Sequence, residues 1–248
     1  MATQTVSPDP ACIARSGVTF RAALRRVPWG RLALGWAIAF AVGAAIAIAA
    51  QAVGWWPGAD WERAMLVAVN ETVSPTLDVI MLTLPFVGTN YTLAPIVAVA
   101  AFLLWRRGYA TVAVHLLIVQ AGSWMLNPAL KFAFVRERPT LFEARGQHAF
   151  PAFPSGHMIA VVAVLGTVAY LLDRCGRGKW AYWVVGAFFL LVGFSRLYLG
   201  VHWPLDVVGG TAVGGAWLWW TVGGMERVHR GGQNGGRVGH GGHGGGGP

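Results

Sequence analysis

Residues 32–53 read LALGWAIAFAVGAAIAIAAQAV and contain no charged side chain. A helix rises about 1.5 Å per residue, so a run of this length can cross a hydrocarbon core of about 30 Å. The run starts too far along the chain, and lacks the cleavage site, for a secretory signal peptide. It therefore predicts a transmembrane helix and an integral membrane protein.

The composition of the chain supports a membrane protein. Of its 248 residues, 55% are hydrophobic and 12% are charged, whereas a soluble domain carries about 25% charged residues. The 13 Trp and 34 Gly suit membrane helices, because Trp collects at interfaces and Gly allows close packing. The net charge of +9 does not point to a nucleic-acid partner, because apolar runs dominate the chain and leave no extended basic face. No nucleic-acid partner is expected. Cys12 and Cys175 predict neither a disulfide framework nor a metal site.

Further apolar segments predict an all-α bundle of about six transmembrane helices. We expect these segments at residues 76–105, 110–134, 158–172, 180–194 and 205–222. The first of them is a broken, kinked or re-entrant element, because Pro85, Gly88 and Pro95 interrupt it, and only its second half crosses fully. The course of residues 54–91 stays open.

The bundle occupies residues 32–225 and lies between two tails. Residues 1–31 are an Arg-bearing cytoplasmic tail, and residues 226–248 are a Gly- and His-rich tail that we expect to be disordered. If the N-terminus is cytoplasmic and the spans alternate, 13 of the 19 basic residues fall inside. The positive-inside rule then places both termini in the cytoplasm. We therefore predict a cell-membrane protein.

Three short motifs fall on the extracytoplasmic side of this topology. The first runs Lys131-Phe-Ala-Phe-Val-Arg-Glu-Arg138-Pro139. Lys131 and Arg138 are two helical turns apart and share a face if the helix continues, while Pro139 marks its end. Taken alone, Lys131 is better explained as a side chain that snorkels from a helix end.

The second motif, Pro154-Ser155-Gly156-His157, precedes an apolar helix. Ser155 occupies an N-cap position, and Gly156 lets a ligand approach the free N–H groups of the helix start. An ordinary helix cap with an unrelated His157 explains the same residues equally well. This motif alone does not establish a binding site.

The third motif runs from Ser195-Arg196 to His202-Trp-Pro-Leu-Asp206. His202 and Asp206 are four residues apart and share a helix face, so the carboxylate can orient the imidazole and fix its tautomer. Asp206 could instead be only a first-turn negative charge that interacts favourably with the helix dipole. His202 could be a membrane-interface histidine whose hydrogen bonds are satisfied.

Together the motifs supply three cations, a helix start, two histidines and a carboxylate on one side of the membrane. Phosphoryl transfer needs such a set, with cations around the phosphoryl oxygens, a nucleophile in line and an acid for the leaving group. Charged residues near membrane spans are costly and usually functional.

The strings K-x6-R-P, P-S-G-H and S-R-x5-H-x3-D, in this order, resemble the three signature motifs of the type 2 phosphatidic acid phosphatase family. The resemblance covers roughly residues 60–225 and implies that the motif helices form the core of the bundle. It implies that His202 is the nucleophile and forms a phosphohistidine, and that Asp206 activates it. His157 would protonate the leaving oxygen and then help to activate water.

The implied phosphate-binding residues are Lys131, Arg138, Ser155, Gly156 and Arg196. No metal or other cofactor is expected, because these fixed groups would stabilise the charge. The implied substrate is a lipid phosphate or diphosphate, such as undecaprenyl diphosphate, phosphatidic acid or phosphatidylglycerol phosphate. The sequence does not choose among these lipids or predict an oligomeric state.

Three alternatives stay open at this point. A phosphotransferase would pass the phosphate to an acceptor other than water, and a haloperoxidase would hold vanadate in the same pocket, although such relatives are soluble. A phosphate-binding transporter would need charges along a path at mid-membrane, where His115 is the main ionisable residue. Four charged residues of the motif-bearing loop are best explained as solvated, namely Arg136, Glu137, Arg145 and His148.

Overall fold

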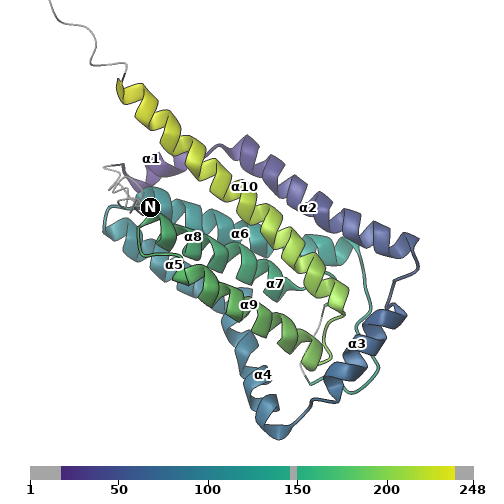
Figure 1. Ribbon diagram of the computed structural model, residues 1–248. Helices are drawn as coiled ribbons and strands as arrows, with labels where there is room; N and C mark the ends of the chain where they lie inside the picture. Colours follow the sequence, from purple (N-terminus) through teal and green to yellow (C-terminus); the bar gives the residue numbers. More distant parts are fainter. Residues whose placement is uncertain (1–17, 146–149, 238–248) are drawn as a thin grey trace, which may run out of the picture.

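The computed structural model describes residues 18–145 and 150–237, and all regular secondary structure in that part of the chain is helical (Figure 1). The elements are α1 (Phe20–Arg25), α2 (Trp29–Ala52), α3 (Asp60–Asn70), α4 (Pro75–Gly88), α5 (Asn90–Arg106), α6 (Ala110–Ala133), α7 (Gly156–Ala160), a π-helical turn (Val161–Leu165), α8 (Gly166–Arg174), α9 (Trp180–Tyr198) and α10 (Pro204–Arg237). The predicted all-α class is confirmed.

Within the described residues, four helices are long and apolar enough to cross a membrane, namely α2, α6, the continuous run Gly156–Arg174 and α9. The pair α4 and α5 adds a fifth span if it counts as one element. Helix α10 is long enough but is not among these helices, because its Gly and polar residues lower its mean hydropathy. The chain is therefore a multi-pass bundle, and the count of about six spans stays a prediction.

The interruption predicted within residues 76–105 lies at Thr89. Helix α4 ends at Gly88, α5 begins at Asn90, and the two axes differ by 47°. The Thr89 hydroxyl accepts a hydrogen bond from the Thr92 backbone N–H at 3.0 Å, which caps the new helix. Pro95 lies inside α5 and does not divide it.

Helices α2 and α10 pack closely along their length (Figure 1). One face of α2 carries small buried residues four apart, namely Gly35, Ala39, Gly43 and Ala47. A Cβ atom on Gly35 would lie 2.0 Å from the Trp220 ring. Small residues therefore bring α10 close to α2, as is common between membrane helices.

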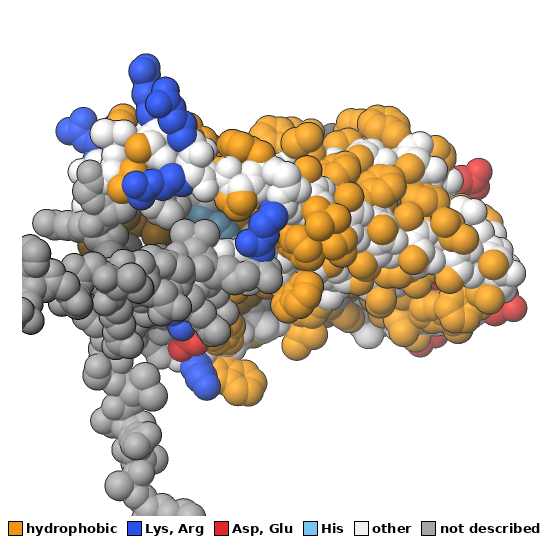
Figure 2. All heavy atoms as spheres, turned by 90° about the horizontal axis from the view of Figure 1, so that it is seen from above, with side chains coloured by type: hydrophobic (Ala, Val, Ile, Leu, Met, Phe, Trp, Pro, Cys, Tyr) orange, Lys and Arg blue, Asp and Glu red, His pale blue; other side chains and the backbone are white. Residues whose placement is uncertain are grey.

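The surface between the two ends of the bundle is largely hydrophobic (Figure 2). Large side chains such as Trp183, Leu190 and Trp219 are more than half exposed. Lys and Arg gather at the end that holds α1, and Asp and Glu gather mainly at the opposite end. This is the distribution of apolar and charged groups that a bilayer requires.

The predicted tails are only partly described. Helix α10 continues to Arg237, beyond residue 226 where the predicted tail begins. Residues 1–17 and 238–248 lie outside the described residues, so the domain boundaries stay predictions.

Candidate active site

Lys131 lies in the last turn of α6 and points into the protein. Its side chain is 5% exposed, and its Nζ donates to the carbonyls of Pro151 and Ala152. The alternative of a lysine that snorkels to the interface does not fit these contacts. Lys131 instead joins the end of α6 to the loop that precedes α7.

Arg138 does not share a helix face with Lys131, because α6 ends at Ala133. The chain then runs without regular structure, and the Arg138 guanidinium returns to the site across this loop. It donates to the carbonyls of Phe150, at 3.0 Å from Nε, and of Val201. The helix therefore does not continue from Lys131 to Arg138, as a shared helix face would require. Both cations nevertheless line the same cavity.

The second motif forms the start of α7. Gly156 and His157 line the cavity, whereas Ser155 is fully buried and does not line it. Ser155 occupies the N-cap position, but its side chain caps no N–H group, and its Oγ has no hydrogen-bond partner among the described residues. Its backbone N–H donates to the Asp206 carbonyl at 2.9 Å, which joins the second motif to the third.

Arg196 lies in the last turn of α9 and is 6% exposed. Its Nη1 lies 3.4 Å from His157 Nε2, and its Nε and Nη2 both donate to Ser195 Oγ at 3.3 Å. A guanidinium that donates to His157 Nε2 places the ring proton on Nδ1 in the neutral tautomer. Arg196 thus connects the second and third motifs.

His202 and Asp206 form the predicted pair at the start of α10. His202 Nδ1 lies 3.3 Å from Asp206 Oδ2, and the same oxygen accepts from the Trp203 backbone N–H at 2.8 Å. Asp206 therefore contacts both the imidazole and a free N–H of the helix start, as each of the two interpretations of its role requires. With Nδ1 donating, Nε2 carries the lone pair.

The surroundings of His202 keep its imidazole neutral. Burial is the main cause that lowers its pKa well below the usual value, and the positive charges of Arg138, Lys131 and Arg196 lower it further. A neutral imidazole has the free lone pair that a nucleophile needs.

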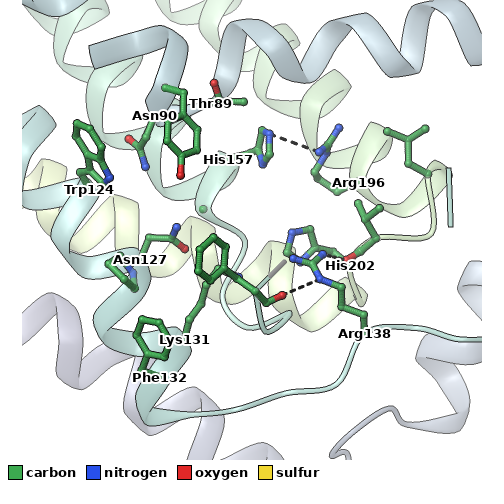
Figure 3. A pocket seen from close by; sticks show the side chains of 16 residues that line it. Thr89, Asn90, Trp124, Asn127, Lys131, Phe132, Arg138, His157, Arg196 and His202 are labelled. Carbon is green, nitrogen blue, oxygen red and sulfur yellow. Dashed lines mark hydrogen bonds between the residues drawn. The ribbon is translucent and has the colours of Figure 1, made fainter. Parts of the chain in front are cut away.

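A cavity of about 580 Å³ brings the motif residues together (Figure 3). Six of the eight predicted site residues line it, namely Lys131, Arg138, Gly156, His157, Arg196 and His202. The other two, Asp206 and Ser155, are fully buried and do not line it. Among the described residues, no group of three or more His, Cys, Asp or Glu side chains could hold a metal ion.

Arg136 is not solvated, which corrects the sequence interpretation. Its side chain is fully buried and donates to Asp206 Oδ1 at 2.7 Å and to Glu62 Oε2 at 2.6 Å. It also donates to the carbonyls of Pro57 and Trp55 and stacks near the Trp56 ring, 4.8 Å from its centroid. The loop folds back over α3, so a charge that looks solvated in the sequence becomes the partner of a catalytic candidate.

Of the other loop charges in that interpretation, Glu137 is exposed as expected, and Arg145 is partly buried near Asp78, with Nε 3.8 Å from Oδ1. His148 lies outside the described residues.

Glu62 is a further residue that the sequence reasoning missed. It is fully buried on α3, and its Oε1 accepts from the Leu205 backbone N–H at 3.0 Å in the first turn of α10. Its Oε2 accepts from Arg136 and from the Ala59 backbone N–H. Glu62, Arg136, Asp206 and His202 therefore form one continuous chain of contacts.

The geometry agrees with what comparison with known proteins finds. The PAP2 superfamily matches residues 108–230. An undecaprenyl-diphosphatase of Sulfolobus acidocaldarius is 31% identical, over 60% of this chain and 71% of the relative. The chain belongs to the PAP2 superfamily. Phosphatidylglycerophosphatase B of Bacillus subtilis is a second PAP2 relative, 29% identical over 63% of this chain and 79% of its own.

A solved PAP2 structure has the same fold. The transmembrane PAP2-type phosphatidylglycerolphosphate phosphatase of Bacillus subtilis superposes with a TM-score of 0.66 and 27% identity. The superposition covers 78% of this chain and 96% of that one. The resemblance first seen in three motifs therefore extends to the arrangement of the helices.

Proposed function

We propose that the protein is a membrane phosphatase that hydrolyses a lipid phosphate or diphosphate through a phosphohistidine intermediate. One observation carries the proposal: His202, oriented by Asp206 through Nδ1, lines a cavity that Lys131, Arg138 and Arg196 also line. The names of the relatives support a lipid substrate, since both act on membrane lipid phosphates.

The first step is attack by His202 Nε2 on the phosphorus atom. The bond between phosphorus and the leaving oxygen breaks, and His157, protonated while the anionic phosphate is bound, gives its proton to that oxygen. Lys131, Arg138 and Arg196, with the Gly156 N–H, hold the phosphoryl oxygens as charge develops. Ser155 is the least direct member of this predicted set, because it lies behind the cavity wall.

In the second step, water attacks the phosphorus of the phosphohistidine. His157, now neutral, takes a proton from the water, and the bond between phosphorus and nitrogen breaks. Free phosphate leaves, and His202 returns to its neutral form. The net reaction consumes one water for each phosphate released, and no cofactor takes part in the proposed steps.

We also propose that the active site faces away from the cytoplasm. The motif residues lie near the end of the bundle opposite to α1, and basic side chains gather at the α1 end (Figure 2). Under the positive-inside rule, the α1 end and both termini are then cytoplasmic. Addition of a membrane-impermeant lipid-phosphate analogue to intact cells and to inverted vesicles tests this orientation, and hydrolysis only in inverted vesicles would contradict it.

The function is tested by phosphate release from purified protein in detergent with EDTA present. The panel holds undecaprenyl diphosphate, phosphatidic acid and phosphatidylglycerol phosphate, assayed with wild type and His202→Ala. The control variant is His229→Ala, a histidine of the predicted C-terminal tail (residues 226–248) outside the three motifs. We expect release by wild type and His229→Ala and none by His202→Ala. Equal release by His202→Ala would contradict the nucleophile, and loss of lipid phosphate without free phosphate would indicate a phosphotransferase.

A further inference from the structure

The cavity is larger than one phosphate needs. Its volume of about 580 Å³ is several times what a phosphate group fills. Arg138, Arg196 and His202 lie toward one end, whereas Asn90 and Asn127 lie toward the other, on the same side as Lys131 (Figure 3). His157, the proposed acid for the leaving group, lies between the two ends in this view. The carboxamide end is therefore where the leaving part of a substrate would sit.

Asn127 lines the cavity with its amide, whose oxygen is buried. It lies one turn before Lys131 on α6, and its Oδ1 is buried without a hydrogen-bond partner among the described residues. The amide packs against Gly156, where an added Cβ would lie 2.7 Å from Asn127 Nδ2. Because Oδ1 is buried, the NH₂ group is the part of this amide that a molecule in the cavity can reach, and it can donate to an acceptor there.

Asn90 supplies a second amide with a fixed orientation. Its side chain is 8% exposed, and its Oδ1 accepts from Gln120 Nε2 at 3.0 Å. This contact leaves the Asn90 NH₂ group for the cavity that the residue lines. Asn90 is also the first residue of the 17-residue helix α5, whose N-terminal end favours an anion.

The chemistry of this end selects an anionic acceptor. Among the described residues that line the cavity, none is acidic. The NH₂ groups of both carboxamides can donate to a molecule in the cavity. A second phosphate offers only acceptors, whereas a glycerol hydroxyl must also donate. The subsite therefore fits a phosphate better than a glycerol.

Exposed aromatic side chains also line the cavity. Tyr91 and Trp124 meet edge to face with ring centroids 6.3 Å apart, and Phe132 and Phe150 do so at 6.4 Å. All four line the cavity and are 45% to 75% exposed on the outer surface. An apolar chain attached to the leaving group can therefore pass from the carboxamide end toward the lipid.

We infer that Asn90 and Asn127 form a second subsite, which binds the inner phosphate of a lipid diphosphate while the outer phosphate occupies the cationic cradle. The inference rests on the proposed function and assigns lipid diphosphates as the preferred substrates of the enzyme. His202 would attack the outer phosphorus, the bond to the bridging oxygen would break, and the lipid monophosphate would leave with the proton from His157. The two amides would hold that monophosphate from the start of the reaction.

The test compares one prenyl chain carrying either one or two phosphates. Prenyl diphosphate and prenyl monophosphate are assayed with wild type, Asn127→Ala, Asn127→Asp and the control Gln51→Ala, an exposed carboxamide on α2. We expect Asn127→Ala to lower kcat/KM for the diphosphate at least tenfold more than for the monophosphate. Asn127→Asp, which adds a negative charge, should widen this gap, and Gln51→Ala should leave the ratio unchanged.

An inhibition measurement makes the test independent of diphosphate turnover. Methylenediphosphonate and methylphosphonate compete with phosphatidic acid, and their inhibition constants are measured with wild type, Asn127→Ala and Asn90→Ala. The preference of wild type for the diphosphonate should fall about tenfold in either variant. Equal losses for both substrates and both inhibitors, or no loss, would overturn the subsite. Failure of wild type to release phosphate from any lipid would instead overturn the proposed function.

Discussion

Arg136 Nη1 lies 2.7 Å from Asp206 Oδ1, and neither side chain is exposed to solvent. Arg136 thereby occupies one carboxylate oxygen, while the other faces His202 and the Trp203 N–H. Glu62 Oε2 lies 2.6 Å from the other terminal nitrogen of the same guanidinium, Nη2. The orientation of the proposed nucleophile thus depends on a residue of α3 and on a loop, in addition to its own helix.

Replacement of Arg136 by Leu should destabilise the protein strongly. The change leaves Glu62 and Asp206 buried without their shared cation, which costs about 3–5 kcal/mol when one partner of a buried pair is removed. The midpoint of thermal unfolding in detergent measures the loss. The control is Arg145→Leu, because the Arg145–Asp78 pair is about one-third exposed and 3.8 Å apart and should contribute about 1 kcal/mol or less. Similar losses in both variants would contradict the prediction.

Replacement of Asp206 by Asn should lower kcat by about 10³-fold or more, because an amide NH₂ group in place of Oδ2 would donate to Nδ1 and favour the wrong tautomer of His202. Single-turnover kinetics in detergent measure the chemical step, and binding of methylphosphonate shows whether the cavity stays intact. The Asp206→Asn variant should still bind the inhibitor. A variant with wild-type turnover would remove Asp206 from the mechanism.

The acidic limb of the pH–rate profile should lie below the usual pKa of histidine. Burial and the nearby cations lower the pKa of His202, so its imidazole stays neutral as pH falls through about 6.5. Arg138→Gln removes one of these cations and should raise the pKa, which moves the midpoint of kcat/KM to higher pH. The same substrate is used with both proteins, so its own titration cancels. A midpoint that moves to lower pH, or does not move, would contradict this account.

Replacement of Gly210 by Ala should destabilise the start of α10. A Cβ atom there would lie 2.4 Å from the Ser155 carbonyl oxygen, and overpacking of this kind costs about 1–3 kcal/mol. The control is Gly215→Ala on the same helix, where nothing lies within 4 Å and where Ala should stabilise by about 0.5–1 kcal/mol. Thermal unfolding of the two variants should therefore move in opposite directions. Movement in the same direction would count against the close contact of α10 with the α7 start.

The sequence was sufficient for the helical class, the interruption near Gly88 and the six predicted residues that line the cavity. These features leave local signals, because apolar runs, breaking residues and short spacings can be read within a few turns. The contact between Arg136 and Glu62 joins residues 74 positions apart, and no local pattern marks it. A charge in a loop is usually solvated, so Arg136 could be recognised only once the loop was seen to fold over α3.

Asn90 and Asn127 escaped the sequence analysis for a related reason. Each is an isolated polar residue in an apolar stretch, and its significance comes from the shared cavity and from Gln120 and Gly156 beside it. The number of spans is also hard to predict. The Gly content of α10 lowers its mean hydropathy, although α10 is a long helix that packs against the apolar helix α2.

The small-residue face of α2 has a consequence for how the catalytic unit can be divided. The PAP2 match begins at residue 108, so α2, Glu62 and Asn90 all lie before it. A fragment cut at that boundary would retain every signature motif, yet α10 would lose the helix it lies against and Arg136 would lose one of its two carboxylates. The motif-bearing half is therefore not a transplantable module, and chimeras of related phosphatases should exchange α2 and α10 together.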